Sequence, residues 1–91
     1  MEKYNKTLNQ AIKQYGVNAQ LEMVVEECAE LIQAIQKYKR NKNSTNEVVF
    51  NSIVENIIDE TADVKIMITQ MEKMFGKSKI SERVEFKVKR L

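Results

Sequence analysis

The sequence predicts an all-α protein, and three observations support that prediction. The chain of 91 residues contains no proline and only two glycines, so it lacks the turn residues that an all-β chain needs. Apolar residues recur every three or four positions over long stretches, as on one face of a helix. Glycines and one polar segment separate these stretches. At about 100–200 residues per domain, residues 1–91 form a single domain.

The first half of the chain predicts two helices with a break between them. Apolar periodicity over about 3–15 indicates the first helix, and Gly16 is placed to end it. A longer apolar face over about 18–40 indicates the second helix, with Asn18 as its N-cap.

The second half predicts two further helices. The polar stretch 41–46 is the clearest loop, and Ser44 with Glu47 three residues later indicates a capping box at the start of the third helix. This helix is expected to end just before Gly76. A shorter fourth helix then covers about 78–90.

The loop is short enough to force the second and third helices into an antiparallel hairpin. If the turn is centred near residues 43 and 44, position i lies opposite position 87 − i, which places Glu27 opposite Glu60. Glu30 and Asp63 are each displaced by about one helical turn. The fold class is therefore predicted to be a four-helix bundle-like subunit with a long antiparallel central helix hairpin.

The small size of the chain predicts self-association. A domain this short buries only a little over ~60% of the surface that its unfolded chain exposes, so we expect a homodimer or a homotetramer. The third helix also carries a second apolar stripe that drifts away from its main apolar face. We expect this stripe to form the subunit interface. Its members are Val54, Ile58, Ala62 and Ile66.

Composition also predicts the compartment. Cys28 is the only cysteine, so no intramolecular disulfide can form, and the first ten residues lack the apolar core of a secretory signal. No window approaches the about 18 consecutive apolar residues of a membrane span. We therefore expect a soluble, cytoplasmic protein with no membrane partner.

Acidic and basic residues are unevenly distributed, although the net charge is only +2. Eight of the thirteen acids fall in two windows without Lys or Arg: Glu22, Glu26, Glu27 and Glu30, then Glu55, Asp59, Glu60 and Asp63. From Lys73 onward, seven basic residues face only two acids. A basic helix of this kind is usually a solvated surface, so we expect no nucleic-acid partner.

The position of Glu60 is unusual, because this acidic residue falls inside the apolar stripe of the third helix. Asp63 lies at the edge of the same stripe. An ionised carboxylate is costly to bury unless it is paired or binds a metal. Several carboxylates at one place also repel, which raises the pKa of at least one of them. A hard divalent cation with oxygen ligands resolves this conflict, and Mg²⁺ characteristically binds a few carboxylates together with phosphate oxygens.

The two acidic segments have the form of paired motifs. Residues 26–30 match EExxE and residues 60–63 match ExxD, on two long helices with a polar loop between them. This arrangement resembles the all-α nucleoside triphosphate pyrophosphohydrolases of the MazG-like superfamily, and the small size is similar to its short, phage-type members. The resemblance covers about 18–75, including the flanking segments LEMVVEECAELIQAI and NIIDETADVKIMITQM.

The resemblance implies Mg²⁺-dependent cleavage of a nucleoside triphosphate between the α and β phosphates, with attack by metal-activated water. By position, Glu27, Glu30, Glu60 and Asp63 match the metal ligands of the family. Glu26 matches a further motif acid that orients or deprotonates water. A metal ion would neutralise triphosphate charge and lower the pKa of bound water.

Phosphate binding needs cations from elsewhere in the chain, since the carboxylates supply only negative charge. Lys37 and Arg40 at the end of the second helix are candidates, together with the basic fourth helix, and Asn56 is a candidate nucleotide contact. Two alternatives stay open. One is phosphoribosyl-ATP pyrophosphohydrolase, an enzyme of similar length with comparable acidic motifs. The other is a helical interaction or nucleic-acid-binding module in which the acids only confer solubility.

Overall fold

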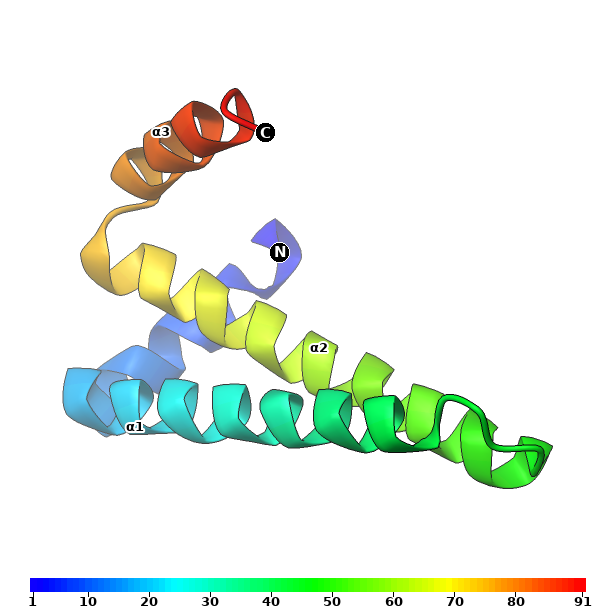
Figure 1. Ribbon diagram of the computed structural model, residues 1–91. Helices are drawn as coiled ribbons and strands as arrows, with labels where there is room; N and C mark the ends of the chain where they lie inside the picture. The colour runs from blue at the N-terminus through cyan, green and yellow to red at the C-terminus, as the bar shows by residue number, and fades with distance from the viewer.

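The computed structural model describes residues 1–91 and contains only helices, which confirms the all-α class. A single 3-10 turn, η1 (Glu2–Tyr4), leads into α1 (Asn5–Asn41), which is followed by α2 (Glu47–Phe75) and α3 (Lys77–Val88). The second part of α1 and α2 lie side by side in opposite directions, joined by the loop between them (Figure 1). None of the helices combines the length and the apolar character that crossing a bilayer would demand.

A kink at Gly16 divides α1 into two helical segments. Gly16 has φ 84° and ψ 165°, a backbone conformation that is essentially restricted to glycine. The predicted break at Gly16 is therefore confirmed. The predicted cap at Asn18 is wrong, because the helical backbone resumes directly after Gly16 and Asn18 lies inside the second segment. The first segment passes behind the C-terminal half of α2 (Figure 1).

The start of α2 differs in detail from the predicted capping box. The Asn46 side-chain oxygen accepts a hydrogen bond from the backbone N–H of Val49 at 3.2 Å, so Asn46 is the N-cap. Ser44 Oγ instead accepts from the backbone N–H of Asn46 at 3.2 Å. Ser44 thus stabilises the turn before the helix. Asn46 caps the helix because it lies three residues before Val49, whose N–H has no partner within the helix.

Contacts at both ends of the paired region hold α1 against α2. Near the loop, the rings of Tyr38 and Phe50 have centroids 5.8 Å apart, one position from the register predicted for the hairpin. At the other end, the buried Gln70 Nε2 donates hydrogen bonds to the Leu8 carbonyl at 2.9 Å and to Gln20 Oε1 at 3.3 Å. Gln70 therefore ties both segments of α1 to α2.

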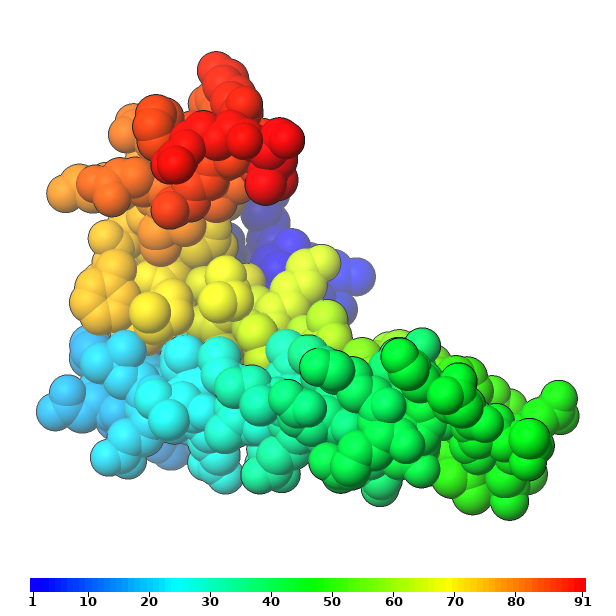
Figure 2. Space-filling view, in the orientation of Figure 1, coloured from blue at the N-terminus to red at the C-terminus, as the bar shows by residue number.

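The last helix, α3, leaves the α1–α2 pair. Gly76 has φ 117°, and its N–H donates to the Glu72 carbonyl at 2.9 Å, which ends α2. Beyond Gly76, α3 contacts α2 near the junction and does not touch α1. Figure 2 shows α3, in orange and red, above the yellow end of α2 and separated by it from the cyan and green part of α1. Within one chain the helices therefore do not close into a four-helix bundle.

The single chain has a small core. Its five buried residues are Gln20, Ala34, Ile53, Met67 and Gln70. The accessible surface is 7412 Å², whereas a compact chain of 10.6 kDa exposes about 5,500 Å². The radius of gyration is 16.1 Å, against about 12 Å for a compact chain of this length. The chain therefore leaves an unusual amount of surface uncovered.

Part of this uncovered surface is the second apolar stripe of α2. The Ile58 side chain is 53% exposed and Ile66 is 38% exposed, with Ala62 exposed between them. Val54 is half-buried. The apolar surface on which the predicted subunit interface depends is thus present, and association itself stays a prediction.

Candidate metal centre

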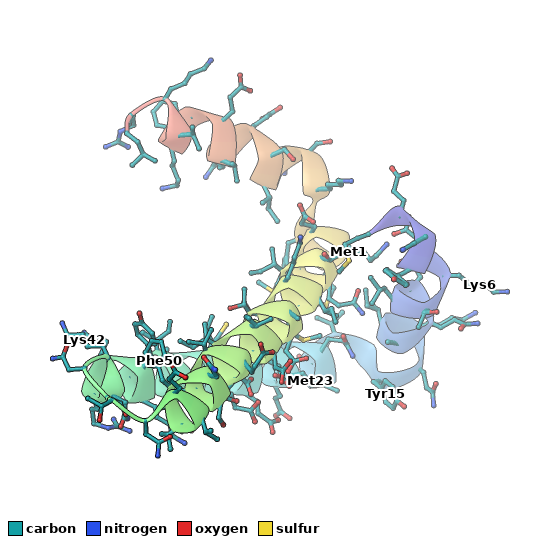
Figure 3. All side chains as sticks on the ribbon, turned by 90° about the vertical axis from the view of Figure 1, so that its right-hand side faces the viewer. Met1, Lys6, Tyr15, Met23, Lys42 and Phe50 are labelled. Atoms are coloured by element: carbon teal, nitrogen blue, oxygen red, sulfur yellow. The ribbon has the colours of Figure 1, made fainter.

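Four carboxylates meet between α1 and α2. Glu27 and Glu30 come from α1, Glu60 and Asp63 come from α2, and one carboxylate oxygen of each lies within 4.8 Å of the other three. Each pair is spaced three residues apart, which puts both members on one face of their helix. Met23, which Figure 3 labels, lies one helical turn before Glu27 on α1.

Two oxygens of this cluster are buried without a hydrogen-bond partner. They are Glu27 Oε2 and Glu60 Oε2, and both side chains are half-buried. No lysine or arginine neutralises them, since the one ion pair of the chain joins Lys89 to Glu85 at the C-terminal end of α3. Buried polar atoms are normally paired, and an unpaired carboxylate oxygen is costly. The cluster therefore requires a proton or a cation.

The pKa values of the cluster respond to this environment. Loss of hydration raises the pKa of Glu27 from 4.5 to about 7, and repulsion from Glu30, Asp63 and Glu60 adds to the shift. The pKa of Glu60 is raised for the same reasons, first by loss of hydration and then mainly by the charge of Glu30. Near neutral pH the protein alone thus retains a proton in the cluster, which a bound cation would displace.

The donor set fits a hard divalent cation. All four donors are carboxylate oxygens, which suit Mg²⁺, Ca²⁺ or Mn²⁺, and the cluster offers no His or Cys of the kind that zinc sites use. Two oxygens that share one ion are separated by at most twice the metal–oxygen distance, about 4.2 Å for Mg²⁺ and about 5 Å for Ca²⁺. The 4.8 Å limit on the separations of the four oxygens lies in this range.

An open groove of about 600 Å³ begins at the cluster. Glu30 and Glu60 line it, as do the basic residues Lys37 and Arg40 and the amide of Asn56. Neither Lys37 nor Arg40 forms an ion pair. The groove thus places free cations beside the carboxylate cluster, an arrangement that suits a ligand carrying both phosphate groups and a divalent cation.

The structure places seven of the eight candidate residues together and leaves one outside. The four carboxylates of the cluster adjoin the groove residues Lys37, Arg40 and Asn56. Glu26 is exposed and contributes no oxygen to the cluster. It precedes Glu27 by one position, so it points about 100° away around α1. The EExxE motif alone does not show which of the adjacent acids Glu26 and Glu27 belongs to the cluster.

The sequence analysis did not identify three further residues that line the groove, Ile32, Gln33 and Gln36. It also missed Ala34, which is 2% exposed and whose small side chain lines the groove. The available signal is helical spacing from Glu30. Gln33 and Ala34 follow it by three and four positions and Lys37 by seven, so they share one face of α1 with the cluster.

In comparisons with known proteins, no family model, curated protein or solved structure matches the chain. The function of the site therefore depends on its own residues and geometry. The paired acidic motifs of the sequence are the remaining guide to a reaction.

Proposed function

We propose that the chain is a Mg²⁺-dependent nucleoside triphosphate pyrophosphohydrolase that releases nucleoside monophosphate and pyrophosphate. The observation that carries this proposal is the cluster of Glu27, Glu30, Glu60 and Asp63, with two buried carboxylate oxygens that lack any partner. The EExxE and ExxD motifs, which resemble those of the MazG-like superfamily, support the same reaction. A deoxynucleoside or noncanonical nucleoside triphosphate is the proposed substrate.

The four carboxylates would hold Mg²⁺ between α1 and α2. When bound, the ion neutralises phosphate charge and lowers the pKa of water. The water oxygen forms a new bond to the α phosphorus, the bond to the oxygen bridging the α and β phosphates breaks, and pyrophosphate leaves. The chain contains no histidine, so the proton of the water goes to a carboxylate of the cluster or to Glu26.

Lys37 and Arg40 would bind the phosphates. Replacing both with glutamine, as K37Q/R40Q, is expected to raise KM for the triphosphate by roughly 10–100-fold, because two charge-assisted contacts are lost. Steady-state kinetics over a range of substrate concentrations measures this change. The matched control is Lys39→Gln, which removes an exposed charge of the same helix that does not line the groove. An unchanged KM in the double variant would place the phosphates elsewhere.

Pyrophosphate release across a panel of ribo-, deoxyribo- and modified triphosphates tests the proposed function. The panel includes phosphoribosyl-ATP, so it also separates the alternative pyrophosphohydrolase. Turnover should require Mg²⁺ and stop when the ion is chelated. No turnover of any substrate, together with salt-sensitive nucleic-acid binding, would instead favour the binding module, for which the exposed basic α3 is the relevant feature.

A further inference from the structure

We propose that residues 77–91, which include α3, form an arm that docks on α1 of a second copy of the chain. In the resulting dimer each chain binds the arm of the other. The arm carries an apolar stripe at four-residue spacing formed by Ile80, Val84 and Val88. Ile80, next to the junction with α2, is half-buried, whereas Val84 is 54% exposed and Val88 is 58% exposed, so the outer part of this stripe is uncovered in its own chain.

The arm requires a partner to be a stable helix. Isolated helices shorter than about 12–15 residues are marginal in water, and α3 has 12 residues. It contacts only α2, close to the glycine junction, and Figure 3 shows it standing away from the N-terminal segment. Burial of its apolar stripe against another chain would supply the missing stabilisation.

Charge identifies the body of another copy, and not its arm, as the docking surface. Residues 77–91 contain six basic and two acidic residues, a net charge of +4. Residues 1–76 contain nine basic and eleven acidic residues, a net charge of −2. Two arms therefore repel each other, whereas an arm and a body attract.

A matching stripe lies on an exposed face of α1. It consists of Val25, Ala29 and Ile32, of which Val25 is 70% exposed and Ile32, which also lines the edge of the groove, is 59% exposed. At 1.5 Å rise per residue this stripe is about 10 Å long, and the stripe of the arm is about 12 Å long. The two apolar stripes therefore have the length needed to cover each other.

Charged residues flank the two stripes with the same spacing. Glu22 and Glu26 lie four residues apart beside the stripe of α1. Arg83 and Lys87 lie four residues apart beside the stripe of the arm. Helical geometry places each pair on one edge of its stripe with the same axial rise, about 6 Å. Docking would thus set two acidic side chains opposite two basic ones.

The uncovered area is sufficient for such a dimer. The chain exposes 7412 Å², about 1,900 Å² more than a compact chain of its mass. A stable interface buries about 1,200–2,000 Å² summed over both partners. Two exchanged arms, one from each chain, would bury part of this exposed surface on each body.

Reciprocal charge reversal of the full-length chain tests the exchange. One variant is R83E/K87E, which makes the edge of the arm's stripe acidic, and the other is E22K/E26K, which makes the edge of its docking surface basic. Each variant alone places like charges together, so its dimer dissociation constant should rise at least tenfold. An equimolar mixture should restore association as a heterodimer, because both arm-to-body contacts are then complementary. Sedimentation equilibrium of each sample measures the masses.

The control is K3E/K6E, which changes the net charge by the same amount as R83E/K87E, at two exposed residues near the N-terminus. It should associate like the unmodified chain. Circular dichroism checks that every variant stays helical. A monomeric unmodified chain, an unchanged dissociation constant in both variants, or a mixture that does not associate would each overturn the proposal. The last result would indicate that the arm folds back on its own chain.

Discussion

Replacing Glu60 with glutamine is expected to lower pyrophosphate release by on the order of 1,000-fold or more. Glu60 supplies one of four clustered carboxylates and also lines the groove, so the substitution removes a charged donor at the point where the cluster meets the substrate space. Glutamine has nearly the same shape, and the helical circular dichroism spectrum should stay unchanged. Retained turnover would remove Glu60 from the site.

The same E60Q variant should not be less stable than the unmodified protein when Mg²⁺ is absent. The substitution removes repulsion from Glu30 and Asp63 and replaces a carboxylate whose buried oxygen has no partner. Thermal unfolding with a chelator present measures this, and Glu47→Gln on the exposed first turn of α2 is the control. A large fall in Tm specific to E60Q would mean that Glu60 has a structural partner.

The carboxylate cluster could be predicted from the sequence because two local features determine it. A short loop fixes which residues of α1 and α2 lie opposite each other, and three-residue spacing fixes which side chains share a face. The Tyr38–Phe50 ring contact lies within one position of the predicted register. The glycine breaks were predictable for a similar reason, since Gly16 and Gly76 both adopt positive φ.

The buried glutamine pair could not be predicted. Gln20 and Gln70 are each 1% exposed, yet glutamine carries no apolar signal, and periodicity treats it as surface. Their burial depends on hydrogen bonds across 50 and 62 positions of sequence, to each other and to the Leu8 carbonyl. Such contacts exist only once the kink at Gly16 has turned the first segment of α1 back against α2.

The N-cap of α2 and the direction of α3 also could not be predicted from the sequence. Both Ser44 and Asn46 have side chains that can cap, and only the path of the loop decides which one reaches a free N–H. The direction of α3 follows from the backbone angles at Gly76, because no contact with α1 constrains it. Local propensity predicts that these elements exist, but it does not orient them.

The metal-free protein is expected to become less stable as the pH rises from about 5.5 to 7.5. The Glu27 carboxyl has a pKa of about 7 in the folded chain and 4.5 as the reference for an unfolded one. Its contribution to stability is therefore fully present below pH 4.5 and is lost as the pH rises through 7. The pKa of Glu60 is shifted in the same direction. The chain has no histidine, so few other side chains titrate in this window.

Mg²⁺ should reverse this trend, because metal binding requires deprotonated carboxylates and so becomes tighter as the pH rises. Thermal unfolding with chelator and with excess Mg²⁺, each at several pH values, measures both effects. Glu27→Gln removes one of the two titrating groups, so it should flatten the metal-free curve and weaken the response to Mg²⁺. A metal-free Tm that stays constant across this window would mean that Glu27 is ionised throughout. The buried oxygens would then be neutralised by a partner other than a proton, and a divalent cation would have no proton to displace.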